Sequence, residues 1–230
     1  MAGTLFPKLE GIQAIVFDAY GTLFNVSGPV EKLAASIGPR SAEFATTWRQ
    51  KQLDYSWLRS LMGVHADFWE VTRQALDYTL AAFEISEAGL ADELMTLYLK
   101  LDAYDDVAAT LVALRAKNKR LAILSNGSPS MLDSTLRHAG LDKSFEAVLS
   151  VEEIGIYKPS RRVYRLALQK LHIADAPSVC FVSANGWDVH GAALFGFRAV
   201  RLARLPVIEE RLPGKPAATL ESLGALPDLL

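Results

Sequence analysis

The stretch that decides the fold runs from residue 14 to residue 24 and reads Ala-Ile-Val-Phe-Asp-Ala-Tyr-Gly-Thr-Leu-Phe. Its first four residues are apolar, include the β-branched Ile15 and Val16, and are followed directly by Asp18. Continuous apolar runs of this length are typical of strands that are buried on both faces of a parallel sheet. The sequence therefore predicts a central strand that ends at a carboxylate, with a turn at Gly21.

Further apolar runs of the same kind occur along the chain, at residues 120–124, 147–149, 179–182 and 199–202. Helical patterns lie between them, at about residues 105–117, 129–139, 160–171 and 187–195. Strands that alternate with helices predict an α/β fold built on a doubly wound parallel sheet. In such a fold ligands bind outside the carboxyl ends of the strands, where Asp18, Ser125 and Ser183 are predicted to lie.

The stretch from residue 25 to residue 103 has a different pattern, because it contains amphipathic helices and no convincing strand. The helices are expected at residues 42–61, 67–83 and 88–101. We therefore expect a helical cap domain at 25–103, inserted into an α/β core domain made of residues 1–24 and 104–230. Caps of this kind exclude water from a site and add side chains to it.

The composition excludes several classes of protein. The chain has 230 residues and a formal charge of −2, whereas nucleic-acid binders usually carry a basic excess. No apolar stretch reaches the roughly 18 residues of a membrane span, so we expect neither nucleic acid nor a membrane as a partner. The single cysteine, Cys180, excludes an internal disulfide. No signal peptide is visible in residues 1–10, so we expect a cytoplasmic location.

Polar side chains follow the predicted strands, and each has a simple explanation when taken alone. Asp18 before a glycine is typical of a turn, Lys158 is typical of a solvated surface, and Asp188 could stabilise a helix start through the dipole. Ser125 and Asn126 could bind an anion or a carboxylate. Because all of them are predicted to meet at one edge of the sheet, together they indicate an active site.

This constellation resembles the haloacid dehalogenase superfamily of hydrolases, and within it the L-2-haloacid dehalogenases. The similarity rests on Phe17 to Phe24, Arg49-Gln50, Ser125-Asn126-Gly127, Tyr157-Lys158-Pro159 with Tyr164, and Ser183 to Asp188. The resemblance implies a Rossmann-like core with an inserted cap. It also implies an enzyme that converts short L-2-haloalkanoic acids to D-2-hydroxy acids and halide, and a homodimer that forms through the cap.

Two positions separate the chain from the phosphatases that this superfamily also contains. The phosphatases have a second aspartate where this chain has Tyr20, and an acid four residues before the last aspartate, where it has Ala184. A halide leaves without a proton, and a monoanionic haloacid does not need Mg²⁺ to neutralise phosphate charge. We therefore expect no metal and no cofactor. The four histidines also lack metal-ligand spacing.

The resemblance implies a catalytic set that consists of Asp18, Thr22, Arg49, Ser125, Lys158, Ser183, Asn185 and Asp188. Asp18 attacks the α-carbon of the substrate in an SN2 displacement and forms an ester. Thr22 orients the nucleophile, and Lys158 keeps it ionised because a nearby positive charge lowers a carboxyl pKa. Asp188 is the base that activates the hydrolytic water, with help from Ser183 and Asn185.

The substrate-binding set that the resemblance implies consists of Ala19, Tyr20, Arg49, Phe68, Ser125, Asn126, Tyr164 and Trp187. Ser125 with nearby backbone amides is suited to the substrate carboxylate, and Arg49 and Asn126 are suited to the departing halide. Tyr164 either hydrogen-bonds within the site or packs a helix of the core. The aromatic side chains of Tyr20, Phe68 and Trp187 are expected to form an apolar wall.

Several alternatives remain open at this point. The chain could be a Mg-dependent phosphatase of the same superfamily, a haloacetate specialist that releases fluoride, or a silent family member that only binds. A phosphoryl-accepting signalling receiver also places Asp, Ser or Thr, and Lys at strand ends, but it has no use for some 80 inserted residues.

Overall fold

One parallel sheet organises the part of the chain that the computed structural model describes, which is residues 8–206 and 208–230. Within these residues six strands pair in the order β3-β2-β1-β4-β5-β6. They are β1 (Ala14–Phe17), β2 (Arg120–Ser125), β3 (Ala147–Ser150), β4 (Val179–Ser183), β5 (Arg198–Leu202) and β6 (Ala218–Leu220). The predicted doubly wound parallel sheet is confirmed, and β6 is a strand that the sequence analysis missed.

The strand order reverses between β1 and β4, which are neighbours at the centre of the sheet. Phe17, the last residue of β1, lies opposite Ile123 of β2 and Val182 of β4. Every residue of β1 and β4 is buried, which explains why both segments are continuously apolar. A reversal of this kind opens a crevice at the carboxyl ends of the two strands.

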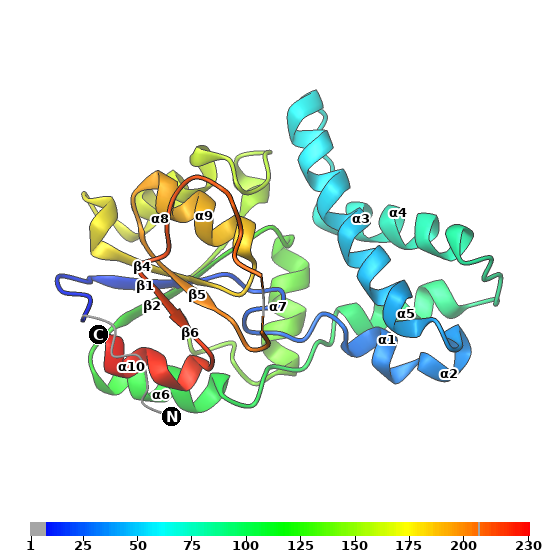
Figure 1. Cartoon of the computed structure of the whole chain (residues 1–230), viewed down its shortest axis with the longest axis horizontal. Helices are drawn as coiled ribbons and strands as arrows, with labels where there is room; N and C mark the ends of the chain where they lie inside the picture. Colours follow the sequence, from blue (N-terminus) through cyan, green and yellow to red (C-terminus); the bar gives the residue numbers. More distant parts are fainter. Residues whose placement is uncertain (1–7, 207) are drawn as a thin grey trace.

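Helices cover both faces of the sheet, as the alternating sequence pattern predicts (Figure 1). On one face lie α8 (Arg161–Leu171) and α9 (Gly186–Phe195), and on the other lie α6 (Val107–Ala116) and α10 (Leu226–Leu229). Helix α7 (Pro129–His138) packs against β3. Short 3₁₀ helices are η1 (Val151–Glu153), η2 (Ala176–Ser178) and η3 (Leu223–Ala225).

A second group of helices stands to one side of the sheet (Figure 1). It consists of α1 (Gly28–Lys32), α2 (Ala34–Ile37), α3 (Ser41–Met62), α4 (Phe68–Ala82) and α5 (Leu90–Tyr98). Helix α3 ends at Gly63, whose φ of 70° suits a glycine. Helix α4 begins after Asp67, whose side chain accepts a hydrogen bond from the amide of Glu70. The sequence analysis did not predict the short helices α1 and α2.

The chain enters and leaves this helical group through two segments that lie side by side. Phe24 and Ala103 form an antiparallel bridge. The amide of Asn25 donates to the carbonyl of Asp102 at 2.9 Å, and the amide of Tyr104 donates to the carbonyl of Leu23 at 3.0 Å. The two crossings are therefore hydrogen-bonded to each other directly after the loop that carries Asp18. None of the helices in the described part of the chain combines the length and hydrophobicity that a membrane span requires.

Candidate active site

Asp18 lies at the carboxyl end of β1, where the strand order reverses, and the residue is 5% exposed. Its Oδ2 atom accepts hydrogen bonds from Asn185 Nδ2 at 2.7 Å, Thr22 Oγ1 at 2.9 Å and Ser183 Oγ at 3.3 Å. Its Oδ1 atom accepts from Lys158 Nζ at 3.0 Å. The two oxygens of this carboxylate therefore have different surroundings, with three neutral donors on one and one cation on the other.

The three neutral donors are themselves held by backbone groups, at the end of β4 and in the loop after β1. The amide of Ala184 donates to Thr22 Oγ1 at 2.8 Å, and the amide of Asn185 donates to Ser183 Oγ at 3.0 Å. Each hydroxyl accepts from a backbone amide and so keeps its single proton for Asp18. Asn185 also donates to the carbonyl of Tyr20 at 3.1 Å. Hydrogen bonds to the backbone thus orient all three donors toward Asp18.

Lys158 joins the two buried aspartates of the site. Its Nζ atom lies 3.0 Å from Asp18 Oδ1 and 2.8 Å from Asp188 Oδ2, and its side chain is fully buried. Burial alone lowers the pKa of the Lys158 ammonium, but the two carboxylates outweigh this effect and raise that pKa above its ordinary value. Lys158 is therefore a cation. Its backbone amide donates to Asn126 Oδ1 at 3.0 Å, which fixes the loop.

Asp188 belongs to the first turn of α9 and is completely buried. Burial raises the pKa of its carboxyl to about 6, and the charge of Asp18 acts in the same direction, while Lys158 opposes both. Tyr164 donates from its hydroxyl to Asp188 Oδ1 at 2.7 Å. Burial holds the pKa of this phenol well above its usual value, so Tyr164 remains a donor. Tyr164 thus hydrogen-bonds within the site.

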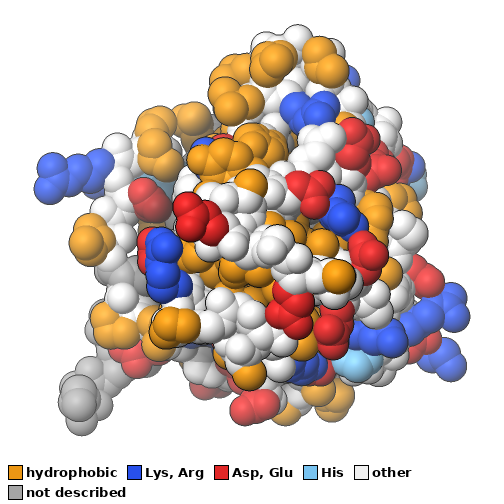
Figure 2. Space-filling view, turned by 90° about the vertical axis from the view of Figure 1, so that its right-hand side faces the viewer, with side chains coloured by type: hydrophobic (Ala, Val, Ile, Leu, Met, Phe, Trp, Pro, Cys, Tyr) orange, Lys and Arg blue, Asp and Glu red, His pale blue; other side chains and the backbone are white. Residues whose placement is uncertain are grey.

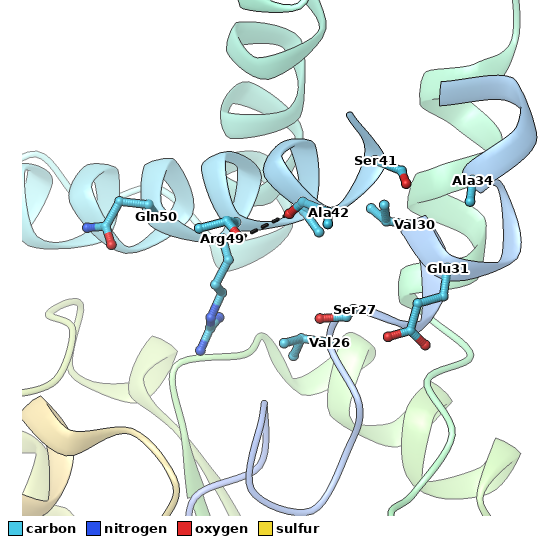
Figure 3. Close-up of a pocket in the computed structure, with 11 residues that line it drawn as sticks. Val26, Ser27, Val30, Glu31, Ala34, Ser41, Ala42, Arg49 and Gln50 are labelled. Atoms are coloured by element: carbon cyan, nitrogen blue, oxygen red, sulfur yellow. Dashed lines mark hydrogen bonds between the residues drawn. The ribbon is translucent and has the colours of Figure 1, made fainter. Parts of the chain in front are cut away.

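Arg49 reaches this edge of the core from α3. Its Nη1 atom donates to Gln52 Oε1 at 2.6 Å, and its Nη2 atom makes longer contacts to the Tyr20 carbonyl at 3.4 Å and to Asn185 Oδ1 at 3.5 Å. Figure 3 shows the side chain extending away from α3 beside a cavity of about 610 Å³ that lies between α1 and α3. The guanidinium therefore joins the helical group to the loops that hold Asp18.

Aromatic rings form an apolar layer beside Asp18. The ring of Tyr20 lies 5.9 Å from that of Phe68 and 5.7 Å from that of Tyr98, measured between centroids. A β-carbon at Gly127 would come within 2.5 Å of the Tyr20 ring, so the close approach of this ring requires a glycine there. Tyr20 and Phe68 were predicted members of the site, whereas the sequence analysis missed Tyr98.

Ser125, Trp187 and Ala19 are among the predicted residues that have no hydrogen bond to the Asp18 carboxylate in the described structure, where its donors are Thr22, Lys158, Ser183 and Asn185. Ser125 is fully buried, and its hydroxyl accepts from the amide of Gly127 at 3.0 Å. Trp187 is half-buried and packs edge-on against Trp57 of α3. Ala19 contributes buried backbone to the turn after β1.

The site also contains polar residues that the sequence analysis did not single out. Gln52 and Thr72 are buried in the helical group and are hydrogen-bonded to each other. Gln52 lies three residues after Arg49 on the same helix, a spacing that places two side chains on one face. That spacing was a usable signal, whereas no feature of the sequence points to Thr72 or to Tyr98.

A lysine side chain supplies the positive charge beside the two aspartates. Among the residues that the structure describes, no three His, Cys, Asp or Glu side chains converge in the way a metal ion requires. The Lys158 ammonium stands between the carboxylates of Asp18 and Asp188. The donor set of the site is thus built around a lysine.

A buried aspartate at a strand end, with a cation on one oxygen and preorganised donors on the other, is suited to act as the nucleophile of a hydrolase. Comparison with known proteins agrees with this class. A family model described as haloacid dehalogenase-like hydrolase matches residues 12–196. The chain is 45% identical to (S)-2-haloacid dehalogenase 1 of Pseudomonas sp. (strain CBS-3), with 96% of this chain and 98% of the relative covered.

Solved structures give the same result. A dehalogenase with an intermediate complex has a TM-score of 0.93 and 40% identity, with 96% of this chain and 97% of that chain covered. The L-2-haloacid dehalogenase from Xanthobacter autotrophicus with chloropropionic acid covalently bound has a TM-score of 0.88 and 40% identity, with 95% and 98% covered. The chain belongs to the haloacid dehalogenase-like hydrolases, and among them to the L-2-haloacid dehalogenase family. The resemblance predicted from the sequence is confirmed.

Proposed function

We propose that this protein hydrolyses short L-2-haloalkanoic acids to D-2-hydroxy acids and halide, through an ester on Asp18. The observation that carries the proposal is the division of donors on Asp18, with Lys158 on Oδ1 and three neutral donors on Oδ2. The relative from Xanthobacter autotrophicus has been solved with chloropropionic acid covalently bound, which supports a covalent mechanism.

In the first step, Asp18 Oδ1 attacks C2 of the substrate, and the carbon–halogen bond breaks as the new carbon–oxygen bond forms. Oδ1 is the nucleophilic atom because it has one hydrogen-bond donor, whereas three donors surround Oδ2. The Lys158 ammonium, 3.0 Å from Oδ1, holds the carboxylate in position for the attack. Attack from the side opposite the halogen inverts C2, so an L-haloacid gives the D-configured ester.

Polar groups near Asp18 are suited to the substrate carboxylate and to the departing halide. Arg49 and Asn126 stabilise the departing halide, and Ser125 with the following amides binds the carboxylate. Asn126 Oδ1 already accepts from the amide of Lys158, so its NH₂ group is the part that can donate. The hydroxyl of Ser125 likewise accepts from the amide of Gly127 and keeps its proton for the substrate.

In the second step, water attacks the carbonyl carbon of the Asp18 ester. The negative charge develops on Oδ2, which already faces Asn185, Thr22 and Ser183 and so finds its oxyanion hole in place. Asp188 accepts the proton of the water, because its pKa of about 6 makes it a stronger base than an ordinary aspartate. It returns this proton to the departing alkoxide, and Asp18 releases one further proton to solvent. The stereocentre is untouched in this step.

The phosphatase alternative fits these residues less well. The place of a second aspartate that could protonate an alkoxide is taken by Tyr20, an aromatic residue in an apolar layer. The place of the additional acid is taken by Ala184. Lys158 already supplies the positive charge beside Asp18 and Asp188. The proposal therefore predicts that EDTA leaves halide release unchanged.

The function is tested by pH-stat titration with L-2-chloropropionate, with chloride and the chirality of lactate measured in the same samples. We expect one proton and one chloride per turnover, D-lactate as product, and no turnover in Asp18→Asn. D-2-chloropropionate, chloroacetate and fluoroacetate serve as comparison substrates. Phosphate release from phosphomonoesters without halide release, or L-lactate as the product, would contradict the proposal. Faster turnover of fluoroacetate than of L-2-chloropropionate would favour the haloacetate specialist.

We also propose that residues 25–103 are the cap and that residues 1–24 and 104–230 are the core. Helices α1 to α5 all fall inside the first range, and the hydrogen-bonded crossings at Phe24 and Ala103 mark its ends. Hydrogen exchange tests this division, because a separate cap should open as its own cooperative unit. Exchange of α3 and α4 together with the central strands would contradict it.

A second copy of the chain is the partner we propose for the far end of α3. Leu61 and Met62 are 84% and 70% exposed there, with Leu58 and Val64 beside them. Figure 2 views the molecule from the side of the helical group and shows hydrophobic side chains gathered at the top, where the end of α3 lies. Light scattering should give the mass of a dimer, and Leu61→Asp should give a monomer. A monomeric unchanged protein would contradict this part of the proposal.

A cytoplasmic location completes the proposal. The one cysteine, Cys180, is a buried free thiol, and proteins with reduced thiols and no disulfide are typical of that compartment. Cell fractionation with an antibody to the protein tests the location, and recovery in the periplasmic fraction would contradict it.

A further inference from the structure

A buried polar cluster inside the helical group lies directly behind Arg49. It consists of Gln52, Thr72 and Tyr98, from α3, α4 and α5. Gln52 is 1% exposed and makes contacts with both ends of its amide. Its Oε1 atom accepts from Arg49 Nη1 at 2.6 Å, and its Nε2 atom donates to Thr72 Oγ1 at 2.6 Å. The Tyr98 hydroxyl lies 3.1 Å from Nε2 and 3.3 Å from Oε1.

The contact with Gln52 is the only hydrogen bond shorter than 3.4 Å that the Arg49 side chain makes in the described structure. The contacts of Arg49 Nη2 with the Tyr20 carbonyl and with Asn185 are 3.4 and 3.5 Å long, at the outer limit for a hydrogen bond. An arginine side chain has many rotamers, and they must be restricted before its guanidinium can act at one place. Gln52 is therefore the group that fixes the direction of Arg49.

The orientation of the Gln52 amide is itself determined by its neighbours. Thr72 has one hydroxyl proton, and it donates this proton to the carbonyl of Phe68 at 2.6 Å. Thr72 must then accept from the NH₂ group of Gln52, which turns the amide oxygen toward Arg49. The carbonyl of Thr72 in turn accepts from Trp48 Nε1 at 3.0 Å. The chain of hydrogen bonds thus begins in the packed interior of the helical group and ends at the guanidinium.

We propose that Gln52 is a positioning residue that aims Arg49 at the departing halide and leaves its positive charge unpaired. The proposal rests on the halide role of Arg49 given above. A neutral amide accepts from the guanidinium without cancelling its charge, so the charge remains available to the halide. A glutamate at this position would form a buried ion pair with Arg49 and compete with the halide for it.

The leaving group provides the test, because chloride departs less readily than bromide and so depends more on a stabilising donor. The quantity to measure is kcat/KM for L-2-bromopropionate divided by kcat/KM for L-2-chloropropionate. This ratio reports on the step that releases halide even if hydrolysis of the ester limits kcat, because kcat/KM covers only the steps up to the first irreversible one. A loss of folded protein lowers both values equally and leaves the ratio unchanged. A variant that is partly unfolded therefore still gives a clear result.

The variants to compare are Arg49→Met, Gln52→Glu and Gln52→Met. We expect each to raise the bromide-to-chloride ratio, Gln52→Glu by about tenfold, as expected for one weakened charge-assisted hydrogen bond. Gln74→Leu is the matched control, because Gln74 accepts from Arg59 Nη2 at 2.8 Å elsewhere in the helical group. Its ratio should equal that of the unchanged enzyme.

The outcomes distinguish the role of Gln52 from the halide role of Arg49. If Arg49→Met raises the ratio and both Gln52 variants leave it unchanged, the positioning role of Gln52 is wrong and the proposed function stands. If Arg49→Met also leaves the ratio unchanged, the halide role of Arg49 is wrong and the proposal for Gln52 falls with it. A rise of the same size in Gln74→Leu would likewise overturn the proposal.

Discussion

Asn185→Ala separates the two chemical steps at Asp18. Asn185 has the shortest hydrogen bond to Oδ2, at 2.7 Å, compared with 2.9 Å for Thr22 and 3.3 Å for Ser183. In the first step Oδ2 does not react, and the loss of a neutral donor makes the carboxylate more nucleophilic. In the second step Oδ2 becomes the oxyanion, and it then lacks its closest donor.

The size of the effect follows from this difference. Removal of one oxyanion donor costs about 2.7–4 kcal/mol of transition-state stabilisation, or about 100- to 1,000-fold in rate. We expect this loss in hydrolysis of the ester and a much smaller change in its formation. Hydrolysis then becomes rate-limiting, and the ester accumulates on Asp18. Ser183→Ala should act in the same direction with a smaller effect, because its contact is longer.

Rapid quench with L-2-chloropropionate tests this expectation. Asn185→Ala should release a burst of chloride equal to the enzyme concentration, followed by a slow steady rate. Intact-mass spectrometry should show one added propionate group on the quenched protein, and proteolysis should locate it on Asp18. The melting temperature serves as the control for folding. Equal slowing of both steps, with no burst and no modified protein, would refute the assignment of Oδ2 as the oxyanion.

Three further predictions concern the supports of the site. In Tyr164→Phe the pKa of Asp188 should rise above its value of about 6, because the lost hydrogen bond favours the ionised carboxyl. Protonation of Asp188 lowers kcat as the pH decreases, so the acidic limb of the kcat profile should move to higher pH in this variant. An unchanged kcat profile would contradict this. Gly127→Ala should lower stability by about 1–3 kcal/mol through contact with the Tyr20 ring, and an unchanged melting temperature would contradict the close packing. Arg204→Met removes an ion pair with Asp106, at the start of α6, and a hydrogen bond to the carbonyl of Thr22. It should lower the free energy of unfolding by about 2 kcal/mol, and a urea denaturation curve that coincides with that of the unchanged protein would contradict this.

The sequence predicts the elements whose burial leaves a pattern, and misses those that depend on packing between distant segments. Strands β1 and β4 are buried on both faces and are therefore continuous apolar runs. Strand β6 has three residues with alternating burial, and such a short segment carries no periodic signal. Helices α1 and α2 have five and four residues, too few for a helical period to be visible.

The same distinction applies to the site. Asp18, Ser183 and Asp188 could be predicted because the carboxyl ends of parallel strands meet at one edge of the sheet. The contact between Gln52 and Tyr98 joins residues 46 positions apart and depends on how α3 and α5 pack. Spacing along the chain therefore indicates which residues approach the nucleophile. It does not indicate which buried polar side chains orient them.

The most direct test of the covalent mechanism is a single turnover of L-2-chloropropionate in ¹⁸O-labelled water with enzyme in excess. If Asp18 is the nucleophile, the new oxygen of the D-lactate comes from its carboxylate, so the lactate of the first turnover is unlabelled. The label then appears in Asp18, where mass spectrometry of the peptide detects it. Labelled lactate in that first turnover, with unlabelled Asp18, would show that water attacks the substrate directly and would contradict the mechanism.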